Sequence, residues 1–330
     1  MAFQDGFGRV HDDLRISVTD RCNLRCTYCM PVEPVWFARE EILSYEEIVR
    51  LARIARRRGV RKYRLTGGEP LVRRDLPLLI RALAREVGPA DLSLTTNGLL
   101  LGALAPALAE AGLSRVNVSL DTLHRERYHR IAGRDALDQV LRGLEAAAEA
   151  GLRPLKVNTV LLRDRNEDEV TTLVSHARDH GWELRFIEFM PLENGRTWDR
   201  SRVVTGEEIR REIERHWPIE PDPQARPDAP ATRYLFRDGK GALGFIDSVT
   251  RPFCSTCSRL RLTADGRLRV CLYDDREVDL RTPLRGGADD AELERLMQRA
   301  VEGKGRGGAL DILDKQAAPS LARTMHQIGG

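Results

Sequence analysis

Apolar positions follow two alternating patterns through the first two thirds of the chain. Short segments rich in β-branched and other apolar residues, such as LRISVT, are typical of buried strands, and longer segments such as SYEEIVRLARIARRRG have the spacing of an amphipathic helix. Ser44 and Glu47 predict a capping box at the start of that helix, and Gly59 is expected just past its end. The patterns predict strands at 14–19, 60–66, 92–97, 115–120, 155–162 and 183–189, and helices at 44–59, 75–88, 103–112, 135–150 and 167–180.

Six strands separated by helices predict a parallel sheet built from right-handed βαβ units. That number favours an open, partial (β/α)6 TIM-like barrel over a closed barrel of eight strands. Functional residues of such folds gather at the carboxyl ends of the strands. The segments that follow the predicted strands have unusual chemistry, and they read DRCNLRCTYC, GGEP, NG, DTL and MPLENG. The fold class and the local chemistry therefore indicate the same face of the sheet.

The alternation ends at residues 218–232, a Pro-, Asp- and Ala-rich segment expected to be a linker or a surface loop. Beyond it the sequence predicts short strands at 233–237, 242–248, 259–263 and 267–272, a turn at 264–266 and a helix at 289–300. We therefore expect an α/β chain with a partial barrel in residues 1–220. A smaller C-terminal α+β domain is expected in residues 221–330.

Composition narrows the possible partners. Charged residues make up 31% of the 330 residues, but the formal net charge is only +3. This balance argues against a general nucleic-acid or anionic-membrane binder, although a local basic pocket for a small anion remains possible. No N-terminal apolar run resembles a signal peptide, and no stretch approaches the ~18 apolar residues of a membrane span. A cytoplasmic protein is expected.

The six cysteines fall into two groups of three, one near each end of the chain. In a reducing compartment, clustered cysteines more often bind metal or take part in chemistry than form disulfides. Structural zinc sites normally have four ligands and a [4Fe–4S] cube normally takes four cysteines, so three cysteines leave one metal position open. By themselves the groups fit a zinc site, a three-ligand iron–sulfur cube or unrelated thiols. The groups are Cys22, Cys26 and Cys29, and Cys254, Cys257 and Cys271.

The first group resembles the cysteine motif of the radical S-adenosylmethionine (SAM) superfamily. The spacing is Cys-x3-Cys-x2-Cys, with the aromatic Tyr28 before the last cysteine. TGGEP at 66–70 resembles the glycine-rich loop of that superfamily, whose glycines are expected to let the backbone approach the methionine part of SAM. The resemblance implies that SAM binds the open iron and is cleaved by one electron to methionine and a 5′-deoxyadenosyl radical.

The second group narrows the resemblance to one family. Arg259 and Arg261 lie between its cysteines and face one side of a predicted strand, as expected of an anion site, although a solvated basic strand has the same pattern. With both cysteine groups, the chain resembles the MoaA family, the GTP 3′,8-cyclases of molybdenum cofactor biosynthesis. The match includes LRISVTDRCNLRCTYCMP, RLTGGEPLVRRDL, VNVSLDTL, RFIEFMP, RLRLTADG and the terminal IGG. It departs from the family at Ser258, where Asn is usual, and in residues 127–137.

The resemblance implies two [4Fe–4S] clusters and a role for each group of site residues. The first cluster binds SAM, and the second binds the guanine of GTP. Arg15 and the terminal diglycine Gly329–Gly330 are implied to assist catalysis. The implied SAM contacts are Tyr28, Gly68, Ser119 and Met190, and the implied GTP contacts are Arg15, Arg64, Thr95, Lys156, Arg259, Leu260 and Arg261.

The implied reaction and partners follow from the same resemblance. The radical takes a hydrogen from C3′ of GTP, C3′ bonds to C8, and reduction gives (8S)-3′,8-cyclo-7,8-dihydroguanosine 5′-triphosphate. A low-potential electron donor such as flavodoxin or ferredoxin, the cyclic pyranopterin monophosphate synthase that acts next, and a homodimer are implied as well. Two alternatives remain at this point. One is another radical SAM enzyme with an auxiliary cluster, such as a peptide modifier, and the other is a zinc-binding protein without enzymatic activity.

Overall fold

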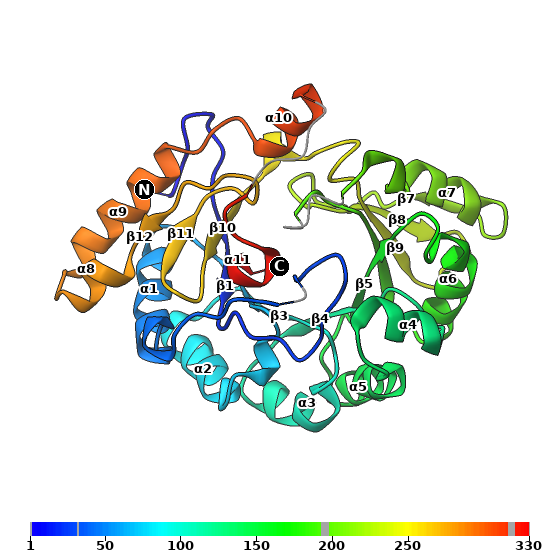
Figure 1. The fold of residues 1–330 in the computed structure, drawn as a ribbon, viewed down its shortest axis with the longest axis horizontal. Coiled ribbons are helices and arrows are strands. Elements are labelled where there is room, and N and C mark those ends of the chain that lie inside the picture. Colours follow the sequence, from blue (N-terminus) through cyan, green and yellow to red (C-terminus); the bar gives the residue numbers. More distant parts are fainter. Residues whose placement is uncertain (1, 32, 193–197, 316–320, 330) are drawn as a thin grey trace.

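The computed structural model describes residues 2–31, 33–192, 198–315 and 321–329. The strands form one strongly curved sheet, and most helices cover its outer side, so the ribbon is an open ring (Figure 1). The last described residues lie inside this ring. Within the described residues, no helix has the length and apolarity that a membrane-spanning segment needs.

Six parallel strands in sequence order form the centre of the sheet. Each follows its neighbour through a helical connection, which confirms the predicted partial (β/α)6 barrel. These strands are β1 (Asp13–Ser17), β2 (Lys62–Thr66), β3 (Asp91–Thr96), β4 (Arg115–Ser119), β5 (Lys156–Leu161) and β6 (Glu183–Glu188).

The helices of the barrel lie where the periodicity predicts them, with two additions. Ser44 and Glu47 form the expected capping box, and Gly59 follows the helix end with a φ of +88°. The additional helices are α4 and α7, which the sequence analysis did not predict. The barrel helices are α1 (Tyr45–Arg57), α2 (Leu76–Ala82, followed by a π-helical turn at Leu83–Val87), α3 (Leu101–Glu110), α4 (Arg125–Ala132), α5 (Leu137–Glu149), α6 (Val170–Asp179) and α7 (Gly206–Glu214).

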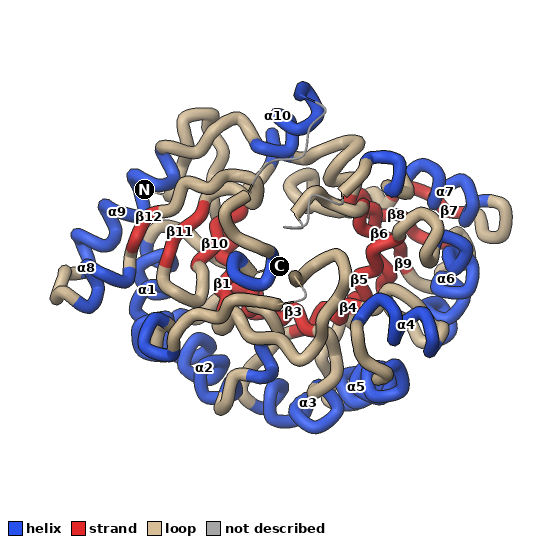
Figure 2. Tube along the Cα trace, viewed as in Figure 1, coloured by secondary structure: helices blue, strands red, loops and turns tan. Residues whose placement is uncertain are grey.

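The C-terminal strands extend both edges of the same sheet, as Figure 2 shows. Strand β9 (Ala242–Ile246) pairs in parallel with β6, and β8 (Thr232–Phe236) and β7 (Ile219–Pro221) follow outward. Residues 218–232 are therefore not only a linker, because β7 lies within them. At the other edge β10 (Arg259–Leu262) pairs in parallel with β1, followed by β11 (Arg267–Arg269) and β12 (Val278–Asp279).

The remaining helices follow the last strands. They are α8 (Arg281–Arg285), α9 (Asp290–Glu302), α10 (Gly308–Lys315) and α11 (Met325–Ile328). Helix α9 matches the predicted late helix, and α11 lies inside the ring (Figure 1).

Strand residues alternate between the hydrophobic core and the interior of the ring. On β1, Leu14 and Ile16 are fully buried in the core, whereas Arg15 lines the interior. On β10, Leu260 and Leu262 belong to the core, and Arg259 and Arg261 line the interior. This period of two places charged side chains inside the ring without exposing the core to water.

Candidate active site

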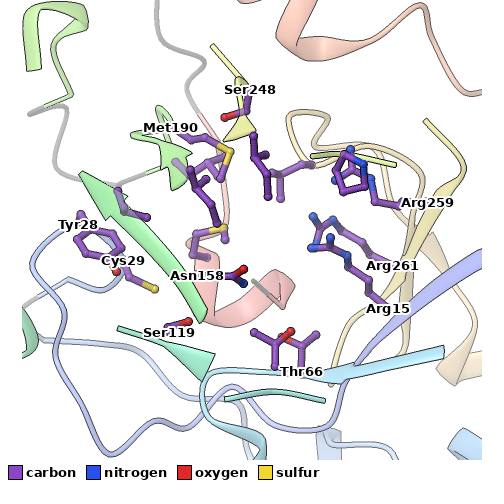
Figure 3. Close-up of a pocket in the computed structure, with 18 of the residues that line it drawn as sticks. Arg15, Tyr28, Cys29, Thr66, Ser119, Asn158, Met190, Ser248, Arg259 and Arg261 are labelled. Atoms are coloured by element: carbon purple, nitrogen blue, oxygen red, sulfur yellow. The ribbon is translucent and has the colours of Figure 1, made fainter. Parts of the chain in front are cut away.

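A cavity of about 310 Å³ lies inside the ring, and all six cysteines line it. The thiols are free, with no disulfide among them. Tyr28 and Cys29 lie on one side of the view in Figure 3, and Arg15, Arg259 and Arg261 lie on the other. One cavity of the size of a small-molecule site therefore joins two cysteine groups from opposite ends of the chain.

The loop that follows β1 carries the first cysteine group and is held by the glycine-rich loop after β2. The backbone N–H of Gly68 donates to the carbonyl of Thr19 at 2.8 Å, and that of Glu69 donates to Arg21 at 2.8 Å. A Cβ at Gly68 would lie 2.4 Å from the Asp20 carbonyl oxygen, which is closer than van der Waals contact allows. The sequence analysis expected a glycine at position 68 so that the backbone can approach SAM. Close packing of Gly68 against the cysteine loop is a second reason for a glycine there.

Tyr28 joins the cysteine loop to the end of β4. Its hydroxyl donates to Oδ2 of Asp121 at 2.6 Å, and the backbone N–H of Val160 donates to Oδ1 of the same carboxylate at 2.9 Å. Burial raises the pKa of Asp121 to about 6. Ser119 and Met190 line the cavity near these residues (Figure 3). The four predicted SAM contacts are therefore all at the wall of the cavity.

Burial determines the protonation of the thiols in the first group. Burial raises the pKa of Cys29 to about 12 and also raises the pKa values of Cys22 and Cys26, so the free thiols stay protonated at neutral pH. Metal coordination deprotonates such thiols. Within the described residues, no group of three or more His, Cys, Asp or Glu side chains is close enough to hold a single metal ion. An iron–sulfur cube has a different requirement, because it spreads its cysteine ligands over several iron atoms.

The second cysteine group surrounds β10 and β11. Cys254 lies in a short 3-10 helix, Cys257 precedes β10, and Cys271 follows β11. Burial raises the pKa of Cys254. Burial acts in the same direction on Cys257, but the charges of Arg259 and Lys304 outweigh it and lower the pKa of Cys257 to about 6. This group therefore lies in a positively charged environment.

Three arginines from adjacent strands form a row along the cavity wall. Arg15 is in register with Arg261 of β10 on one side and with Arg64 of β2 on the other. Burial, followed by the charges of Arg261 and Arg64, lowers the pKa of Arg15 well below its usual value. Nε of Arg15 is buried and has no hydrogen-bond partner within the described part of the chain. Buried positive charges without enough counter-charge make a binding site for an anion.

The C-terminal tail reaches this row. Nη1 of Arg261 donates to the carbonyl of Gly329 at 2.5 Å. A Cβ at Gly329 would lie 3.0 Å from side-chain atoms of Ser17 and Thr66, so a larger residue would not fit without movement. Gly330, the second predicted residue of the tail, lies outside the described residues.

Two predicted GTP contacts do not line the cavity. The ammonium of Lys156 lies 3.5 Å from Oε1 of Glu183, next to the Arg185 side chain that does line the cavity. Leu260 is fully buried in the core on the other face of β10, because side chains alternate along a strand. The other predicted GTP contacts line the cavity, and they are Arg15, Arg64, Thr95, Arg259 and Arg261.

The cavity wall also contains polar residues that the sequence analysis did not select. Oδ1 of Asn158, Oγ of Ser248 and the hydroxyl of Tyr273 are buried and have no hydrogen-bond partner within the described residues. Asn158 and Arg185 could have been found as polar residues that alternate with apolar ones along the predicted strands. Ser248 had no such signal, because the parallel pairing of β9 with β6 is a tertiary feature. Unpartnered polar atoms at a cavity wall are available to bond a polar ligand or water.

Comparisons with known proteins agree with this geometry. Residues 16–177 match the family model of the radical SAM superfamily, and residues 182–309 match the model described as Molybdenum Cofactor Synthesis C. A GTP 3′,8-cyclase of Moorella thermoacetica is 46% identical over 99% of this chain and 100% of that protein. A GTP 3′,8-cyclase of Rhodopirellula baltica is 47% identical over 100% of this chain and 92% of that protein.

Solved structures support the fold. Streptococcus suis SuiB bound to S-adenosylmethionine has a TM-score of 0.60 and 14% identity, over 87% of this chain and 68% of that chain. SuiB bound to the precursor peptide SuiA has a TM-score of 0.53 and 20% identity, over 63% of this chain and 46% of that chain. Identities this low show a shared fold alone. The sequence relatives are 46% and 47% identical and match nearly the whole chain, so they also show the family. The chain belongs to the radical SAM superfamily and, within it, to the GTP 3′,8-cyclase family.

Proposed function

We propose that this chain is a GTP 3′,8-cyclase that converts GTP to (8S)-3′,8-cyclo-7,8-dihydroguanosine 5′-triphosphate, the first step of molybdenum cofactor biosynthesis. The observation that carries the proposal is that both free cysteine trios and several buried arginines line one and the same cavity. Such a cavity can hold a cluster-bound cosubstrate and an anionic nucleotide together, which radical transfer between them requires.

In this proposal residues 1–220 provide the SAM site. Cys22, Cys26 and Cys29 would hold the first [4Fe–4S] cluster, which would supply an open iron for SAM. Gly68 keeps the cysteine loop close to the glycine-rich loop, and Ser119 and Met190 contact SAM from the ends of β4 and β6. Tyr28 is kept in place by its hydrogen bond to Asp121.

Residues 221–330 complete the GTP site. Cys254, Cys257 and Cys271 would hold the second [4Fe–4S] cluster, which would supply an open coordination position for the guanine. The arginine row binds the triphosphate, because charge-assisted contacts to guanidinium groups suit phosphate oxygens. Thr95 lines the same wall. Lys156 lies on the same face of β5 as the lining residues Asn158 and Val160, and its ammonium pairs with Glu183. Leu260 contributes through its backbone position and the packing of β10 rather than through its side chain.

The chemistry depends on positioning. When bound, the reduced first cluster and SAM supply the 5′-deoxyadenosyl radical that removes the hydrogen from C3′ of GTP. The chain holds the triphosphate and the base at two fixed places, so that C3′ faces the SAM side and C8 is within reach of C3′. Arg15 and the tail residues Gly329 and Gly330 assist this reaction in our proposal. Arg261, the partner of Arg15 in register, donates to the carbonyl of Gly329.

The proposal includes partners as well. Reducing the SAM cluster requires a low-potential electron donor such as flavodoxin or ferredoxin. The product passes to cyclic pyranopterin monophosphate synthase, and the enzyme works as a homodimer in the cytoplasm.

Anaerobic reconstitution tests the proposal. The reconstituted chain is incubated with GTP, SAM and a strong reductant, and iron content, 5′-deoxyadenosine and the cyclised nucleotide are measured. We expect about eight irons per chain and formation of the cyclised product together with 5′-deoxyadenosine. SAM cleavage without any conversion of GTP would instead indicate another radical SAM enzyme. Two zinc ions and no iron would exclude the radical reaction.

A further inference from the structure

Lys304, just beyond the end of α9, is a buried ammonium that lies outside the cavity and has a complete set of partners. Lys304 is 4% exposed, and its side chain is not among those that line the cavity. Nζ lies 3.2 Å from the carbonyl oxygen of Arg259, 3.5 Å from Nδ1 of His11 and 3.6 Å from Sγ of Cys257. An ammonium has three N–H donors and no acceptor, so three acceptors are what a charged lysine requires.

His11 is fixed as an acceptor for Lys304. Its Nε2 lies 2.9 Å from Oδ2 of Asp5, and a carboxylate can only accept, so Nε2 carries the proton and Nδ1 has the free lone pair. Burial, followed by the charge of Lys304, lowers the pKa of His11 to about 4, so the ring is neutral at neutral pH. The neutral ring therefore adds no positive charge of its own next to Lys304.

Asp5 is in turn held by Arg9. Nε of Arg9 donates to Oδ2 of Asp5 at 2.6 Å, and the backbone N–H groups of Phe7 and Arg9 donate to Oδ1. The other guanidinium nitrogens of Arg9 donate to the carbonyls of Cys254 at 2.8 Å, Gly305 at 2.7 Å and Arg306 at 2.8 Å. The N-terminal segment thus ties the loop of Cys254 to the residues that follow Lys304.

We propose that Lys304 is a positioning residue that holds a positive charge against the sulfur of Cys257 and thereby raises the reduction potential of the cluster bound by Cys254, Cys257 and Cys271. The proposal rests on the second cluster of the proposed function. A reduced cluster is more negative than an oxidised one, so a nearby cation and an N–H donor to a ligand sulfur stabilise the reduced state. Arg259 also lies near this sulfur, but it faces the cavity, whereas Lys304 acts from outside the cavity.

The test compares the two clusters within one molecule. Wild-type protein, Lys304→Met and Lys304→Arg are reconstituted anaerobically, their iron is counted, and both clusters are titrated potentiometrically with electron paramagnetic resonance as the readout. The signal that changes on adding SAM belongs to the first cluster, and the signal that changes on adding GTP belongs to the second. Lys240→Met, in the exposed turn between β8 and β9, is the matched lysine control.

We expect Lys304→Met to lower the potential of the GTP-sensitive signal only, with Lys304→Arg close to wild type and Lys240→Met unchanged. If Lys304→Met retains both clusters at wild-type potentials, the proposal is overturned. If it loses only the second cluster, Lys304→Gln is titrated in its place, where a lowered GTP-sensitive potential supports the proposal and a wild-type potential, or no second cluster, overturns it. If Lys304→Met loses both clusters, Lys304→Gln is titrated in the same way. A second cluster at the wild-type potential in Lys304→Gln, or no cluster in that variant, would also overturn the proposal. A wild-type chain with about four irons contradicts the proposed second cluster itself, whatever the variants do.

Discussion

Arg15 and Arg261 are partners in register on the adjacent parallel strands β1 and β10, although they come from opposite ends of the chain. Both side chains line the cavity, and Arg261 also contacts the carbonyl of Gly329. Because β10 joins the barrel sheet at its β1 edge, the pairing brings the second cysteine group and the C-terminal tail to the same cavity as the first group.

The arginines of β10 are expected to bind GTP without affecting the SAM site. Arg259→Ala or Arg261→Ala should weaken GTP binding by about 1.5–3 kcal/mol, which is about tenfold to a hundredfold in affinity, because each removes a charge-assisted contact. Reductive cleavage of SAM should persist. Equilibrium binding of GTP and 5′-deoxyadenosine formation measure the two effects, with the exposed Arg295→Ala as a control. An unchanged GTP affinity in both variants would refute this role.

Each cysteine group is expected to hold its own cluster. Cys26→Ala should lose about half of the iron and all SAM cleavage, whereas Cys257→Ala should lose about half of the iron but retain SAM cleavage without cyclisation of GTP. Iron and sulfide analysis with product detection distinguishes the two patterns. Full iron content in either variant would show that its cysteine is not a ligand.

Gly68→Ala is expected to disturb the first cluster. The added Cβ would lie 2.4 Å from the carbonyl oxygen of Asp20 and 2.5 Å from that of Arg21, so the cysteine loop has to move. Such overpacking costs about 1–3 kcal/mol. Iron content, SAM affinity and thermal unfolding are measured, with Gly102→Ala as the matched control, since a Cβ there has no neighbour closer than 3.9 Å. Equal behaviour of the two variants would rule out this steric role.

The tail is expected to depend on an ion-pair anchor. Arg323 contacts both oxygens of Asp265 at 2.9 Å and Oε2 of Glu277 at 2.9 Å, and it precedes the turn that brings Gly329 to Arg261. Deleting Gly329–Gly330 should impair cyclisation with both clusters intact, and Arg323→Ala should reduce it in the same direction. Product formation and iron content are measured together. A fully active truncated chain would contradict a role for the tail.

The buried His11 is expected to make stability depend on pH. Its pKa is about 4 in the folded chain against an ordinary value of 6.5, so the unfolded chain binds the proton first. The contribution to stability is complete above pH 6.5 and is lost as the pH falls toward 4, by up to about 1.4 kcal/mol per pH unit. His11→Gln should flatten this slope in anaerobic thermal unfolding between pH 7.5 and 5.5. The exposed His129→Gln serves as a control and should keep the wild-type slope.

The sequence by itself determined the local structure and much of the chemistry. The repeated strand and helix patterns predicted six parallel strands, because periodicity depends on which face of each element is buried. The spacing within each cysteine group and the alternation of Arg259 and Arg261 were also readable, since short spacings in a loop or strand need no tertiary information. Helix α4, with the charged sequence RERYHRIA, was missed because its apolar face is too short for a clear pattern.

Only the tertiary structure decided how the two ends of the chain meet. The sequence did not indicate that β9 and β10 extend opposite edges of one sheet, because strand pairing depends on contacts between distant residues. It therefore did not reveal the register of Arg15 with Arg261, the place of Ser248 in the cavity wall, or the contact of Lys304 with Cys257. It also suggested a role for Leu260 beside the ligand, whereas strand alternation places that side chain in the core on the other face of β10. Such contacts join segments that are far apart in sequence, and the free energy of packing the whole sheet decides between the alternatives.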